Sequence, residues 1–172
     1  MDLRQNIAKL VNHDAIKKVA TNAREQGKTV VFTNGCFDLL HPGHVHLLMA
    51  SRSFGDLLVV AINTDASVRG IKDNGRPIYS ENERAYMLDA LSCVDHVVLF
   101  EDPTPIPLLN LIKPDILVKG DHYEPEEVVG WDTVESYGGR IERVPVLEGI
   151  STTSTIERIY GIGRWEDRFQ ND

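Results

Sequence analysis

The fold of this chain is decided by residues 30–49, which read VVFTNGCFDLLHPGHVHLLM. The stretch opens with a short apolar run, which is typical of a strand buried on both faces of a parallel sheet. Pro42 stands where a helix can begin, because the first turn of a helix tolerates a missing amide. A strand that passes through a glycine-containing turn into a helix predicts a helix N-terminus able to bind an anion.

The rest of the chain repeats this alternation of strand and helix. Apolar runs at residues 57–62, 97–100 and 116–118 predict three more buried strands. The alternating run 140–144 predicts a fifth strand, at an edge of the sheet.

Helical patterns precede the first strand and follow later ones. Residues 14–26 form the first, a capping box at residues 80–83 opens a second over 84–91, and a third covers 151–160 and ends at Gly161. Together the patterns predict an α/β fold, a Rossmann-like doubly wound parallel sheet of about five strands with flanking helices, in a single domain.

The length of 172 residues suits one domain. We expect a helical N-terminal extension over residues 1–27, the main domain over residues 28–162 and a polar C-terminal tail over residues 163–172. In a doubly wound sheet, ligands bind beyond the carboxyl ends of the strands. Candidate functional residues are therefore sought directly after each apolar run.

The net charge of the chain limits the classes of ligand that it can bind. Lysine and arginine number 18 against 26 aspartates and glutamates, which gives a formal net charge of −8. This balance argues against nucleic-acid binding, which needs a basic surface. A phosphorylated ligand remains compatible with it, because a few cations and backbone amides suffice to hold one.

The sequence predicts a cytoplasmic protein without a membrane partner. Its two cysteines, Cys36 and Cys93, do not form a disulfide framework, which favours a reducing compartment. No apolar run approaches the length of about 18 residues that spans a bilayer. The first residues lack the charged and apolar regions of a signal peptide.

Two histidines follow the turn after the first strand. His41 and His44 are three residues apart, so in a helical turn they share a face and can both donate to phosphate oxygens. Two surface histidines in a tight turn are the plainer interpretation. No third ligand is spaced to complete a metal site, and none is predicted.

The whole string at residues 33–44 resembles the signature of the nucleotidylyltransferase superfamily, His-x-Gly-His after the first strand. Further segments between Lys28 and Ile159 also resemble it. They are Asn63–Arg69 with Lys72, Gly75–Ile78, Glu83–Leu88 with Val94-Asp95, Val118–Gly120, Tyr137–Gly139 and Gly149–Thr153. Within the superfamily, the pattern is most similar to adenylyltransferase domains that act on D-glycero-β-D-manno-heptose 1-phosphate.

This resemblance implies transfer of AMP from ATP to a sugar 1-phosphate, with release of pyrophosphate and formation of ADP-heptose for the lipopolysaccharide inner core. Mg²⁺ is implied as the counterion of ATP. The segment before the first strand is too short for a sugar kinase, so a separate heptose kinase is expected upstream. A homo-oligomer is left open.

The resemblance also implies roles for single residues. The catalytic residues would be His41, His44 and Lys72. Nucleotide binding would involve Thr33, Asn34, Gly35, Cys36, Phe37, Arg84, Lys119, Gly120, Ser151, Thr152 and Thr153. The sugar phosphate would meet Asp38, Arg76, Asp121 and His122. His122 stands where the family usually has aspartate.

Several alternatives remain at this stage. Lys72 and Arg76 are also consistent with a solvated loop, Ser151 with a plain helix cap, and Arg84 with a surface residue paired to Glu81 or Asp89. Asp38 either orients the histidine turn or binds substrate. For the whole chain, the alternatives are a cytidylyltransferase for glycerol 3-phosphate, a non-catalytic nucleotide-binding module and a protein-interaction scaffold.

Overall fold

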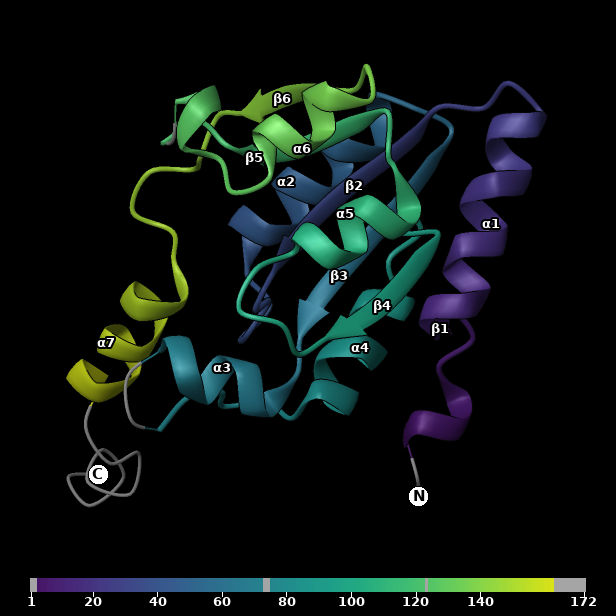
Figure 1. Ribbon diagram of the computed structural model, residues 1–172. Helices are drawn as coiled ribbons and strands as arrows, with labels where there is room; N and C mark the ends of the chain where they lie inside the picture. Colours follow the sequence, from purple (N-terminus) through teal and green to yellow (C-terminus); the bar gives the residue numbers. More distant parts are fainter. Residues whose placement is uncertain (1–2, 73–74, 123, 163–172) are drawn as a thin grey trace, which may run out of the picture.

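The order of strands in one sheet places the functional residues. The computed structural model describes residues 3–72, 75–122 and 124–162. Six parallel strands pair in the order β1-β4-β3-β2-β5-β6 (Figure 1). They are β1 (Leu10–Val11), β2 (Val30–Gly35), β3 (Leu57–Asn63), β4 (His96–Phe100), β5 (Ile116–Gly120) and β6 (Arg140–Val144).

Helices alternate with the strands along the chain. They are α1 (His13–Glu25), α2 (Pro42–Ser53), α3 (Asp65–Ile71), α4 (Glu81–Asp89), α5 (Ile106–Ile112), α6 (Trp131–Ser136) and α7 (Thr152–Ile162), with 3-10 turns η1 (Leu3–Asn6) and η2 (Pro125–Glu127). Figure 1 shows α7 apart from the sheet, after the long segment that follows β6. No helix in the described ranges has the length and apolar character needed to cross a membrane.

The sheet has a buried core on each face. Val30 and Phe32 of β2 belong to the cluster with α1, α5 and α6, whereas Val31 belongs to the cluster with α2 and α4. Because successive side chains of a strand point to opposite faces, one continuous apolar run serves both cores. The core therefore explains why the strands read as unbroken apolar runs.

The topological switch point lies between β2 and β5. From β2 the chain builds outward through β3 and β4, and then crosses back to place β5 on the other side of β2. Loops that leave β2 and β5 at their carboxyl ends therefore diverge, which opens a crevice there. This crevice is where a ligand site is expected in such a sheet.

The sequence-based fold prediction is confirmed, with differences in detail. The sheet has six strands instead of about five, because β1 adds two residues beside β4 within the segment expected to be helical. Helix α7 continues through Gly161, so its expected end there is wrong. The C-terminal tail expected at 163–172 lies outside the described residues, and the limits of the main domain stay a prediction.

Candidate active site

A cavity of about 560 Å³ lies over the switch point. Residues 34–37, at the end of β2 and directly after it, line the cavity together with His44 of α2. Asn63 and Lys72 border it from the β3 side, and Lys119, Gly120 and His122 from the β5 side. The cavity thus gathers residues from the connections that follow β2, β3 and β5, whose carboxyl ends meet at the same edge of a parallel sheet.

The two histidines lie in different positions relative to this cavity. His44 lines it, whereas His41 caps α2 and lines an outer hollow with Pro42 and Val45. The backbone amide of His44 donates to Nδ1 of His41 at 3.3 Å, so the proton of a neutral His41 ring sits on Nε2. Their rings stack with centroids 3.7 Å apart.

Both imidazoles are held in the neutral form. Burial lowers the pKa of His44 to about 4, and the neighbouring His41 adds to the effect. Burial also lowers the pKa of His41. Gly43 permits this packing, because a Cβ there would lie 3.1 Å from the His41 ring. At neutral pH, His44 therefore acts as a hydrogen-bond donor or acceptor and not as a cation.

Asp38 is enclosed by protein donors. Its carboxylate accepts from the amides of Ile78 and Tyr79 at about 3.0 Å and pairs with Nε of Arg76. Burial alone would raise the pKa of Asp38, but these donors hold it below its usual value. Thr152 Oγ1 donates to the Asp38 carbonyl at 2.8 Å. Of the two roles left open by the sequence, the structure favours the orienting role over contact with substrate.

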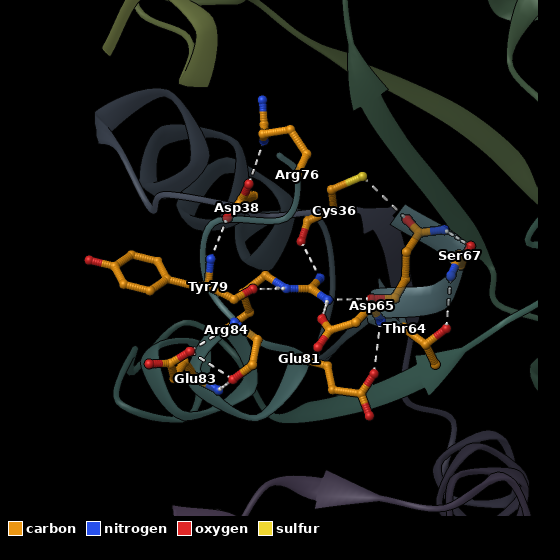
Figure 2. Close-up of polar contacts among 12 residues, drawn as sticks. Cys36, Asp38, Thr64, Asp65, Ser67, Arg76, Tyr79, Glu81, Glu83 and Arg84 are labelled. Carbon is orange, nitrogen blue, oxygen red and sulfur yellow. Dashed lines mark hydrogen bonds and ion pairs between the residues drawn. The ribbon is translucent and has the colours of Figure 1, made fainter. Parts of the chain in front are cut away.

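Arg84 is also enclosed, so it is not the exposed surface residue that one of the sequence alternatives describes. The side chain has no solvent exposure, and its guanidinium donates to the carbonyls of Tyr79, Cys36 and Asn63 and to Oδ1 of Asp65 (Figure 2). It is neither a surface residue nor a lining residue of the cavity. These contacts give Arg84 a structural role that joins the ends of β2 and β3 to the segment before α4, and its phosphate contact stays a prediction.

Lys119 closes the crevice from the β5 side. Its Nζ donates to the carbonyl of Asn34 at 2.8 Å, which links the ends of β5 and β2 across the switch point. Burial lowers the pKa of Lys119 to about 8, with Cys36 acting in the opposite sense. Burial raises the pKa of the Cys36 thiol, so that cysteine is not an activated nucleophile.

Other predicted residues lie elsewhere. Thr33 is buried and its Oγ1 donates to Val118 O between two strands. Asp121 is exposed and accepts from the amide of Val146. Arg76 borders a separate hollow between α3 and α4. Residues 151–153 open α7, where Ser151 Oγ accepts from the Ser154 amide as a cap does. The lining of the switch-point cavity includes none of these residues.

An apolar wall was missed by the sequence analysis. Phe100, Pro103 and Pro105 line the cavity after β4, and Val128 and Val129 line it after η2. Residues 103 and 105 had a usable signal, since they directly follow the carboxyl end of a predicted strand. Val128 and Val129 come eight or more residues after β5, so their distance from that strand did not point to the cavity.

The described residues do not form a metal-binding site for Mg²⁺ from protein ligands alone. They contain no group of three histidine, cysteine, aspartate or glutamate side chains placed to hold a metal ion. Mg²⁺ that accompanies a nucleotide would be held by phosphates and water.

The doubly wound sheet and the histidine and lysines over its switch point define a nucleotide-binding α/β protein of the nucleotidyltransferase class. The chain belongs to the cytidylyltransferase-like family, whose model matches residues 32–158.

Similar proteins include two named Bifunctional protein HldE. That of Syntrophotalea carbinolica is 55% identical over 152 residues, covering 88% of this chain and 31% of the relative. That of Trichlorobacter lovleyi is 50% identical over 159 residues, covering 92% and 32%. The chain therefore spans about a third of the length of these relatives.

Two solved structures share the fold. A lipopolysaccharide core biosynthesis protein from Thermoplasma volcanium is 31% identical with a TM-score of 0.57, and the match covers 70% of this chain and 98% of that one. A pantoate-β-alanine ligase from Francisella tularensis is 15% identical with a TM-score of 0.63, covering 87% and 72%. The second likeness concerns the fold alone.

Proposed function

We propose that this chain transfers AMP from ATP to a sugar 1-phosphate, D-glycero-β-D-manno-heptose 1-phosphate, and releases pyrophosphate to form ADP-heptose. The observation that carries the proposal is the cavity over the switch point, which brings together His44, Lys72 and Lys119. The likeness to HldE proteins and to a lipopolysaccharide core biosynthesis protein supports the choice of sugar.

The proposed reaction needs charge stabilisation and little else. An oxygen of the sugar phosphate attacks the α-phosphorus of ATP in line, the bond to the bridging oxygen breaks, and pyrophosphate leaves with the electron pair. The attacking oxygen is already anionic, so no general base is required. Catalysis then consists of positioning and of stabilising charge on the phosphates.

The residues divide this work by their charge state. His44 is neutral, so it donates a hydrogen bond to a phosphate oxygen without adding a full charge. Lys72 and Lys119 supply the positive charge from opposite sides of the cavity. His41 fixes the start of α2 behind His44. The apolar wall of Phe100, Pro103, Pro105, Val128 and Val129 excludes water from the reacting groups.

A kinase that acts before this reaction is part of the proposal. A nucleotide sugar linked at the anomeric carbon requires a phosphate there beforehand, and adenylyl transfer does not supply it. A heptose kinase, with any phosphatase needed to leave the 1-phosphate, would provide the substrate. The compartment of both reactions is proposed to be the cytoplasm.

The test is pyrophosphate release from ATP, CTP, GTP and UTP with heptose 1-phosphate, glucose 1-phosphate and glycerol 3-phosphate. We expect release with ATP and heptose 1-phosphate, and an ADP-sugar by mass spectrometry. Turnover of CTP with glycerol 3-phosphate would replace the proposal by a cytidylyltransferase. Nucleotide binding without any turnover would indicate a non-catalytic module. His44→Ala serves as the inactive control.

A further inference from the structure

Lys119 carries a charge that the described protein leaves uncompensated. Its Nζ has one hydrogen-bond partner, the neutral carbonyl of Asn34. Within the described ranges, no carboxylate lies at ion-pair distance from this ammonium. Burying an ammonium without an anion is unfavourable, and the protein lowers the pKa of Lys119 to about 8 as a result.

The surroundings of Lys119 do not supply the missing anion. The other titratable side chains that line the cavity are Cys36 after β2, His44 on α2, Lys72 after α3, and His122 and Glu127 after β5. Lys72 is a second cation, His44 is neutral, and the raised pKa of Cys36 keeps its thiol protonated. Glu127 accepts from the Glu124 amide at 2.9 Å, within its own turn.

We propose that Lys119 is the anion receptor of the cavity, and that a phosphate group of the ligand pairs with its ammonium at the switch point. Ligand binding is then coupled to protonation of this side chain. The proposal rests on the proposed function, since it takes a phosphorylated ligand as given. The phosphate belongs either to ATP or to the sugar phosphate, and the experiment distinguishes the two.

The coupling has a definite sign. The paired anion favours the charged form of Lys119, so the complex binds a proton that the free protein lacks above about pH 8. Affinity is therefore highest below pH 8 and falls as pH rises through that value. Between pH 7 and pH 9 the Kd should rise about tenfold, and at pH 8.5 binding should take up about 0.7 proton.

Titration calorimetry measures this uptake. ATP and heptose 1-phosphate are titrated separately at pH 8.5 in two buffers with different ionisation enthalpies, since both ligands are fully ionised there. The ligand whose binding takes up the proton is the one that supplies the phosphate. The same titrations at pH 7 should show almost no uptake.

Three variants complete the design. Lys119→Met should weaken binding at pH 7 and abolish both the uptake and the dependence on pH. Lys119→Arg keeps a permanent charge, so it should retain binding and lose the uptake. Lys18→Met, on the exposed face of α1, is the matched control and should behave as the parent protein. Circular dichroism establishes that each variant is folded.

The outcomes separate the two proposals. Binding without proton uptake in the parent protein, or uptake unchanged in Lys119→Met, would overturn the role of Lys119 and leave the proposed function standing. Failure of both ligands to bind the folded parent protein would overturn the proposed function and the anion receptor together.

Discussion

The imidazole rings of His41 and His44 stack with centroids 3.7 Å apart and planes 19° from parallel. Two charged rings would repel each other at this separation, and burial opposes either charge. The neutral ring of His44 therefore lines the cavity, whereas the ring of His41 lines the outer hollow. This arrangement makes the two histidines unequal in any reaction.

His44→Ala should lower kcat by about 10²–10³-fold, with a smaller change in the KM for ATP. A donor aimed at charge that develops in the transition state contributes mainly to turnover. Steady-state kinetics of pyrophosphate release give both constants. His46→Ala on the same helix lies outside the cavity and is the matched control. Turnover of His44→Ala within a few-fold of the parent would contradict this role.

The same histidine should make the fold sensitive to acid. The pKa of His44 is lowered to about 4, so the folded state excludes a proton that the unfolded chain binds below its ordinary pKa of 6.5. Stability is therefore complete above pH 6.5 and falls as pH drops toward 4. Urea unfolding from pH 7 to pH 4 should show a shallower loss in His44→Gln. Identical pH profiles would show that His44 does not contribute.

Arg84→Met should destabilise the protein by about 3–5 kcal/mol, because it leaves Asp65 and three carbonyls without their donor. Urea unfolding measures the loss, and Arg84→Lys should fall between the parent and Arg84→Met. Arg69→Met, an exposed change on α3, should stay within about 0.5 kcal/mol. Equal effects of the substitutions at Arg84 and Arg69 would refute the structural role of Arg84.

Asp38→Asn should cost about 3 kcal/mol of stability, since a buried ion pair loses one partner while Arg76 stays charged. The pKa of Asp38 is held below its usual value in the folded protein. The ionised carboxylate therefore stabilises the fold fully when the pH is above the usual pKa, and this stabilisation is lost as pH falls through the lowered pKa. Thermal unfolding at pH 7 and pH 3 checks both points. Asp102→Asn, which is exposed, should change neither.

His122→Asp should alter the KM for the sugar phosphate several-fold and leave the KM for ATP nearly unchanged. A neutral imidazole both donates and accepts, whereas a carboxylate only accepts, and one hydrogen bond contributes about 1 kcal/mol. His122 lines the cavity beside Gly120. His46→Asp, outside the cavity, is the control. A change confined to the KM for ATP would mean that the two substrates bind the other way round.

The fold could be predicted from sequence because strands buried on both faces of a parallel sheet consist of consecutive apolar residues. All four strands expected from such runs are present, and the fifth, Arg140–Val144, lies at the edge as its alternation indicated. The elements that were missed are short. Strand β1 has two residues, and α3, α5 and α6 have six or seven, too few for a periodic pattern to emerge.

The site could be predicted only in part, because a residue type does not reveal which of its neighbours it will meet. Lys72 and Lys119 do line the cavity. Arg84 was expected to face phosphate, and its four protein partners come from segments up to 48 residues away. The partners of a buried cation depend on tertiary packing, to which local sequence gives no access.

The two peptide groups that flank the Tyr79 side chain are both hydrogen-bonded to buried charged residues. Asp38 accepts from the amide of Tyr79, and Arg84 donates to its carbonyl, so both sides of this residue are tied to the body of the protein (Figure 2). A segment that closes over its ligand must exchange such bonds at every cycle. Residues 76–79 already hold these hydrogen bonds in the free protein. The conformational entropy of ordering them is therefore lost once, when the chain folds, instead of at each turnover.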